Sequence, residues 1–89
     1  PDSVFVEVIL TREQQEDLEA FESAVRKLPE VMECYLMSGE YDYLLRVVVA
    51  NTADYERIHR EHITRLPGVA RSNSMLVLRT VKKTTALPV

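Results

Sequence analysis

The sequence lacks the cysteines that would form disulfides and the long apolar runs that would span a membrane. Its 89 residues include one cysteine, two glycines and no tryptophan. The single Cys34 excludes an intrachain disulfide framework, and no Cys-x-x-Cys pair exists for zinc or redox chemistry. No apolar run approaches the roughly 18 residues that span a bilayer. We therefore expect a reducing cytoplasm and no contact with a membrane.

Clustered positive charge is also missing. The formal net charge is −3, and Arg79, Lys82 and Lys83 are too few to form a basic block. Because proteins grip nucleic-acid phosphates with clustered Lys and Arg, this chain is not expected to bind DNA by itself. Its 46% hydrophobic and 28% charged residues are ordinary for a globular protein. We expect one domain over residues 1–89, and one so small that self-association would help it.

The first third of the chain predicts a strand followed by a helix. Residues 3–10 place valine or leucine at every second position, which is the period of a strand. Thr11 and Gln14 then have capping-box spacing. Apolar residues recur at helical intervals behind them until Pro29 stops the helix.

Residues 33–50 predict a hairpin, because the runs on either side of residues 38–42 are rich in β-branched and aromatic residues. The turn is the expected place for function. Backbone N–H groups freed around Gly39 can hold a ligand carboxylate, and the Asp42 carboxylate can accept an ammonium. The plainer interpretation is that both residues only satisfy turn geometry. The polar residues of this turn are Ser38, Gly39, Glu40 and Asp42.

The last third predicts a second helix and a long final strand. Asn51 is the expected N-cap, and a Pro-Gly pair at residues 67–68 ends the helical stripe. Residues 69–82 then form the expected strand, with Val69 and Met75 on one face. The tail that follows, residues 84–89, has no periodicity of its own.

The order strand, helix, strand, strand, helix, strand predicts an α+β fold of the ferredoxin-like βαββαβ type. Two helices should cover one face of a four-stranded antiparallel sheet. Leu44 and Val48 alternate with Leu45, so apolar side chains remain on the bare face whichever set meets the helices. We therefore expect a dimer through these bare faces, with the tail crossing onto the partner. An open apolar groove for a peptide or lipid is the alternative.

No catalytic or metal-binding constellation emerges. His59 and His62 are three residues apart on one helix face, but no third ligand stands at a recognisable spacing. Cys34 has no neighbouring base in the sequence, so it is expected to be a packed thiol. The carboxylates between Glu33 and Asp42 do not define an acid/base pair. Neither enzymatic activity, nor a metal, nor a cofactor is expected.

Two sequence segments are together specific for one protein family, and a third segment at the end of the chain extends the match. Residues 31–46 contain Gly-Glu-Tyr-Asp-Tyr-Leu-Leu, residues 65–69 contain Leu-Pro-Gly-Val, and residues 81–88 end the match. With these segments at this separation, the chain resembles the C-terminal effector domain, or RAM domain, of the Lrp/AsnC (feast/famine) transcription regulators. The resemblance covers the chain from about Val4 to its end.

This resemblance implies a cytoplasmic regulator that dimerises through its sheets and often forms an octamer of four dimers. An amino acid or similar metabolite binds between dimers, near the hairpin turn, and shifts assembly or DNA affinity. In the family, a helix-turn-helix domain that normally precedes this one binds DNA. The given sequence does not contain that domain, so the resemblance implies no DNA contact by residues 1–89 themselves. The ligand positions that the resemblance implies are Leu36, Gly39, Tyr41, Asp42, Ser74, Met75, Leu76 and Val77.

Two other interpretations remain open from the sequence. A small dimeric α/β-barrel enzyme of the monooxygenase type shares this strand order, and would need His59 or His62 in a cleft between sheet and helices. A pure assembly module without any ligand is the second.

Overall fold

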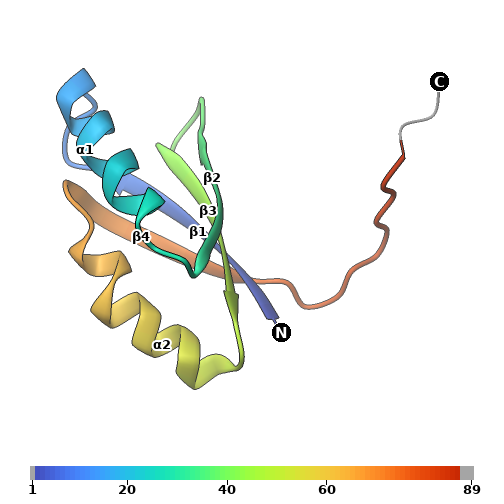
Figure 1. Ribbon diagram of the computed structural model, residues 1–89. Helices are drawn as coiled ribbons and strands as arrows, with labels where there is room; N and C mark the ends of the chain where they lie inside the picture. Colours follow the sequence, from blue (N-terminus) through green and yellow to red (C-terminus); the bar gives the residue numbers. More distant parts are fainter. Residues whose placement is uncertain (1, 87–89) are drawn as a thin grey trace.

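The computed structural model of the protein describes residues 2–86, so the last three positions of the expected tail lie outside the described residues. Four antiparallel strands form one sheet in the order β2-β3-β1-β4 (Figure 1). The predicted ferredoxin-like βαββαβ fold is confirmed. In chain order the elements are β1 (Asp2–Leu10), α1 (Gln15–Arg26), β2 (Val31–Leu36), β3 (Tyr43–Val49), α2 (Thr52–Glu61), a 3₁₀ turn η1 (Ile63–Arg65) and β4 (Val69–Leu76).

The core lies between the helices and one face of the sheet. Every second residue from Val4 to Leu10 in β1 and from Tyr43 to Val49 in β3 is buried. The rings of Phe21 from α1 and Tyr43 stack with their centroids 4.4 Å apart. Burying one such aliphatic or aromatic side chain contributes about 1.5 to 3 kcal/mol, so the alternation in the two central strands determines which face the helices cover.

Helix α1 begins later than the sequence predicts. Gln14, not Thr11, is the N-cap, and its backbone N–H donates to Oδ2 of Asp17 at 3.2 Å. The Thr11 backbone N–H instead donates to the Gly68 carbonyl at 2.8 Å. The predicted cap at Thr11 was wrong because this contact between two loops fixes Thr11 at the end of β1.

Helix α2 begins as predicted but ends early. Oδ1 of Asn51 accepts the backbone N–H of Asp54 at 2.9 Å, which confirms the N-cap. The helix stops at Glu61 and continues as the 3₁₀ turn η1 rather than as one helix. Ile63 and Leu66 nevertheless remain buried, so the apolar stripe still reaches the core.

Strand β4 is shorter than the predicted strand over residues 69–82. It ends at Leu76, which lies opposite Val4. Little of β1 remains beyond Val4, so the residues that follow Leu76 have no neighbouring strand to bond. Residues 77–86, called the C-terminal arm below, run away from the sheet (Figure 1), and Leu78 in this arm is 94% exposed.

A register shift between Ile9 and Leu10 changes which residues of β4 share a face. Val69 lies opposite Leu10 and packs against the core. Met75 lies opposite Phe5, on the face away from the helices. The prediction that Val69 and Met75 share a face was wrong, because simple alternation does not survive a bulge.

The sheet face away from the helices, called the open face below, is mixed in character. Leu44 and Val48 lie on it as predicted, since they alternate with the buried residues of β3. The strand registers add further apolar side chains, which are Phe5, Ile9 and Met75. They also place a set of polar side chains there, which are Glu7, Glu33, Arg46 and Asn73. The face therefore carries the apolar side chains that the sequence predicts, together with polar residues that alternation in single strands did not bring together.

Candidate functional site

The β2–β3 turn is rigidly attached to the end of β1. The Met37 backbone N–H donates to the Asp42 carbonyl at 2.9 Å, and the Asp42 N–H donates to the Val8 carbonyl at 2.9 Å. Oδ2 of Asp42 accepts the backbone N–H of Leu10 at 2.7 Å. Gly39 has a φ of +120°, a conformation that favours glycine. The turn thus presents Asp42 with one carboxylate oxygen bound to β1.

A trough of about 550 Å³ lies beside this turn. Its central strand is β1, which separates the turn from β4. Glu7 and Ile9 form its floor, Glu40 and Tyr41 one wall, and Arg71 and Asn73 the other. Nδ2 of Asn73 donates to Oε1 of Glu7 at 3.0 Å across two of these strands. A volume of this size is typical of small-molecule sites, which span about 300 to 1,000 Å³.

The eight predicted ligand positions fall into two groups. Four belong to the turn or its approach, and four to the end of β4 and the start of the arm. Asp42 bonds Leu10, whereas Ser74 lies opposite Val6. Strand rise and strand spacing put the two groups roughly 15 Å apart within one chain. A single amino acid cannot touch both groups of the same chain.

The side chains of the β4 group also point to different faces of the sheet. The hydroxyls of Ser74 and Tyr55 are hydrogen-bonded to each other, on the helix side of the sheet. Met75 lies on the open face, and Leu76 is 57% exposed beyond it. Of the eight predicted positions, only Tyr41 lines the trough.

Sequence reasoning missed the residues that complete the trough, namely Glu7, Ile9, Arg71 and Asn73. Each looked like an ordinary outward-facing strand residue. The signal that would have found them is the antiparallel register, which places Arg71 opposite Ile9 and Asn73 opposite Glu7. Beyond these pairs the register shifts, because Ala70 is an extra residue of β4 between Arg71 and Val69, and the sequence does not announce this bulge.

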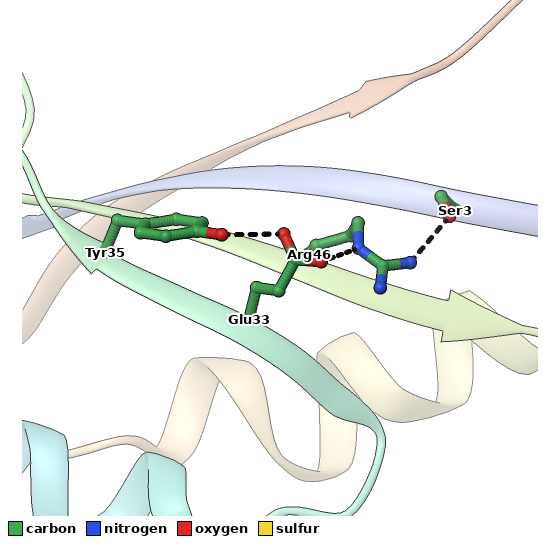
Figure 2. A network of polar contacts seen from close by, with 4 residues as sticks. All are labelled: Ser3, Glu33, Tyr35 and Arg46. Carbon is green, nitrogen blue, oxygen red and sulfur yellow. Dashed lines mark hydrogen bonds and ion pairs between the residues drawn. The ribbon is translucent and has the colours of Figure 1, made fainter. Parts of the chain in front are cut away.

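A second polar group crosses the open face away from the trough. Nε of Arg46 donates to Oε2 of Glu33 at 2.7 Å, and Nη1 donates to Oγ of Ser3 at 3.2 Å. The Tyr35 hydroxyl donates to Oε1 of Glu33 at 3.0 Å. Figure 2 shows these side chains aligned across β2, β3 and β1. The hydrogen bonds from Arg46 and then Tyr35 lower the pKa of Glu33 below its ordinary value of 4.5.

Replacing Arg46 with alanine is expected to raise the pKa of Glu33 back toward 4.5, because the largest cause of the shift is removed. A lowered pKa means that the ionised carboxylate stabilises the fold above pH 4.5, and that this gain disappears as the pH falls through the lowered pKa. An NMR titration of the Glu33 carboxyl measures the change. Arg57→Ala breaks the separate ion pair with Asp54 and should leave the pKa of Glu33 unchanged. A pKa of Glu33 that does not rise in Arg46→Ala would contradict the expectation.

The thiol and phenol under α1 are protonated structural groups. Burial raises the pKa of the Cys34 thiol to about 11, so it is the packed thiol that the sequence predicts. Burial, followed by its hydrogen bond to Glu22, raises the pKa of the Tyr43 hydroxyl as well. Both groups lie beside a smaller cleft of about 250 Å³ between α1 and β2.

The two histidines do not meet at a reactive centre. Nε2 of His59 lies 3.1 Å from Oγ of Ser72, and its ring centroid lies 5.8 Å from that of Tyr55. Neither His59 nor His62 lines the trough. Within residues 2–86, no three His, Cys, Asp or Glu side chains gather closely enough to hold a metal ion. Over the same residues, no helix is long and apolar enough to cross a membrane.

The fold defines a class of protein: a ferredoxin-like α+β domain, with an open trough where the hairpin turn meets the sheet. The chain matches the Lrp/AsnC ligand binding domain over residues 3–87. It therefore belongs to the Lrp/AsnC family, as the three sequence segments indicated.

Similar proteins are transcription regulators. An HTH-type regulator of Sinorhizobium fredii is 49% identical over 79 residues, which cover 89% of this chain and 62% of that protein. The leucine-responsive regulatory protein of Klebsiella pneumoniae is 42% identical over 84 residues, which cover 94% of this chain and 51% of that protein. The chain thus spans about half to three fifths of the length of these relatives.

Solved structures agree with the fold. A regulator from Neisseria meningitidis, solved as a complex with L-Met, superposes with a TM-score of 0.86 at 32% identity, covering 98% of this chain and 56% of that one. An AsnC family regulator from Agrobacterium tumefaciens gives 0.83 at 37% identity, with the same coverage. AsnC of E. coli gives 0.87 at 20% identity, covering 98% of this chain and 57% of that one, and is evidence for the fold alone.

Proposed function

We propose that this domain binds a free amino acid, or a similar small metabolite, and couples that binding to the assembly of a cytoplasmic transcription regulator. The main support is the rigid turn, which presents Asp42 beside a trough that carries both signs of charge. The relatives' names point to the same ligand class, since one was solved with L-Met and another is called leucine-responsive.

The ligand is proposed to bind near the β2–β3 turn, between dimers. The turn group and the β4 group lie roughly 15 Å apart in one chain, so a second copy must bring its β4 group to the turn. Oδ2 of Asp42 is engaged by Leu10, which leaves the other oxygen to accept an ammonium. The proposed contacts are Leu36, Gly39, Tyr41, Asp42, Ser74, Met75, Leu76 and Val77.

The open face is proposed to be the dimer interface. Phe5 and Met75 are apolar cross-strand neighbours at its centre, and Leu44 lies one pair further along the same face, opposite Glu7. The C-terminal arm supports a crossing onto the partner, because its sequence favours a strand but its own chain offers none to pair with. Four such dimers would form the octamer that the family resemblance implies.

DNA is proposed to be contacted through a helix-turn-helix domain and not through this one. The chain spans 62% and 51% of two relatives that are transcription regulators, and its own net charge is −3. The proposed role is therefore regulatory, with no catalytic residue, metal or cofactor.

Replacing Asp42 with asparagine should weaken amino-acid binding by about tenfold or more, because a charge-assisted hydrogen bond contributes about 1.5 to 3 kcal/mol. The amide oxygen still accepts the Leu10 N–H, so the fold should persist. Asp42→Ala should bind equally poorly and also lose about 1 to 3 kcal/mol of stability through the unsatisfied N–H.

A thermal-shift screen over the twenty amino acids selects the ligand for calorimetry on both variants. A ligand at about 100 times its dissociation constant stabilises the fold by roughly 2.7 kcal/mol, which such a screen detects. Unchanged affinity in Asp42→Asn would remove this residue from the site. Flat melting curves with all twenty would instead favour a ligand-free assembly module.

A further inference from the structure

The centre of the open face holds one positive and one negative side chain. Arg46 of β3 lies opposite Phe5 of β1, and Glu7 lies two residues further along β1, opposite Leu44. Both charged side chains are partly exposed in the single chain. A dimer through this face removes both from water, and a buried charge is tolerated only when it is paired and hydrogen-bonded. The proposed dimer therefore has to satisfy the remaining hydrogen-bonding groups of both side chains.

Each of these two side chains keeps hydrogen-bonding capacity that its own chain does not use. Nε and Nη1 of Arg46 donate to Glu33 and Ser3, which leaves the N–H groups of Nη2 without a protein acceptor within residues 2–86. Oε1 of Glu7 accepts an asparagine amide of β4, which leaves Oε2 free over the same residues. Glu33, by contrast, already accepts through both oxygens, from Arg46 and from a tyrosine hydroxyl. Of the two carboxylates on the strands of the open face, Glu7 is therefore the one that can accept a further hydrogen bond.

The guanidinium of Arg46 is held in position within its own chain. Figure 2 shows this side chain lying along the sheet, bonded to Glu33 and Ser3. Because these bonds restrict its rotamers, less side-chain entropy is lost when a further bond forms. Facing sheets pack about 10 Å apart. A guanidinium lying along a sheet stands about 4 Å above the backbone, an extended glutamate reaches about 5 Å, and a charge-assisted hydrogen bond adds about 2.8 Å, so the two side chains together span that gap.

We infer that Arg46 of each copy binds the free carboxylate oxygen of Glu7 of the partner subunit, so that two symmetric ion pairs fix how the two sheets face each other. The inference rests on the proposed dimer and adds the contact that sets its register. In a two-fold interface, a contact from Arg46 to Glu7 is necessarily made twice. Placements that bring two Arg46 or two Glu7 side chains together are disfavoured by like-charge repulsion. The partner that fits this face is a second copy of the chain, since a sheet without either charge leaves the opposing group unpaired.

Charge reversals followed by mixing test this pairing. Glu7→Arg and Arg46→Glu each bring like charges together in the homodimer, so each should weaken dimerisation about tenfold or more. An equimolar mixture of the two variants should form a heterodimer, because both of its contacts join opposite charges again. A chain that carries both reversals should dimerise by itself for the same reason. Analytical ultracentrifugation at micromolar concentrations measures the dissociation constants, and native mass spectrometry identifies the heterodimer by its mass.

Two matched controls and one milder variant complete the experiment. Glu16→Arg on α1 and Arg65→Glu on η1 make the same reversals at exposed positions off the sheet, and both should remain dimeric. Glu7→Gln keeps the shape of the side chain and an oxygen for Asn73, so its circular dichroism should match that of the wild type. It should weaken the dimer about fivefold, because a charge-assisted hydrogen bond becomes a neutral one.

The outcomes separate the pairing from the interface on which it rests. If Phe5→Asp dissociates the dimer while both reversals leave it intact, the interface stands and the pairing is wrong. If each reversal dissociates the dimer but neither the mixture nor the double variant restores it, the two charges act within one chain and the pairing is again wrong. Unchanged dimerisation of Glu7→Gln also overturns the pairing. A monomeric wild-type chain overturns the interface and the pairing together.

Discussion

Replacing Leu45 with alanine is expected to lower the free energy of unfolding by about 2 to 5 kcal/mol. Leu45 is fully buried at the centre of β3, where its side chain meets the core between sheet and helices. Removing it loses the transfer free energy of the side chain and leaves a cavity that the close-packed sheet cannot fill. Since small domains are stable by only about 5 to 15 kcal/mol, this single change approaches unfolding.

Urea denaturation at one fixed protein concentration measures this loss, because self-association would otherwise alter the midpoint. Leu36→Ala is the matched control: it removes the same atoms at the end of β2, where the side chain is 59% exposed. The control should cost less than about 1 kcal/mol. A similar loss in both variants would show that the core is not centred on β1 and β3.

Replacing Phe5 with aspartate is expected to dissociate the proposed dimer into monomers. Phe5 lies between Arg46 and Met75 in the middle of the open face. In the proposed dimer its ring is covered by the partner's sheet, so the variant loses apolar burial and places a charge in the interface. Truncation of a hot-spot residue, of the kind found near the centre of an interface, costs about 2 kcal/mol or more, which is about thirtyfold or greater in the dissociation constant.

Analytical ultracentrifugation at micromolar concentrations measures the change. Ala20→Asp adds the same charge on the exposed side of α1 and should leave the dimer intact. A wild-type chain that sediments as a single subunit would refute the proposed interface. A Phe5→Asp variant that remains dimeric would move the interface to another surface.

The fold could be predicted because its two strongest patterns are local. Alternation in residues 3–10 and 43–49 and the helical stripe around Phe21 and Ile58 predict the elements, and their order leaves few topologies. Errors arose where distant segments compete for a backbone group. The Thr11 backbone bonds Gly68 and does not cap a helix, and β4 stops near the start of β1.

The candidate site was only partly predictable. The turn with Gly39 and Asp42 is continuous in sequence, so its polar residues and tight geometry could be expected from residue types alone. The opposite wall comes from β4, about thirty positions along the chain, and only strand pairing brings Arg71 to it. Likewise, nothing in the sequence near Glu33 or Arg46 predicts that they interact. The pairing of β2 with β3 brings them together, and they then form an ion pair.

The sequence by itself determined the type and chain order of the main elements and the family, because each depends on the period of apolar residues and on short motifs. The tertiary structure decided which residues share the open face and which line the trough. The physical reason is that one shifted residue in a strand sends every later side chain to the other face. The bulge at Ala70 of β4, opposite Ile9 and Leu10, is such a shift, and no local pattern in the sequence records it.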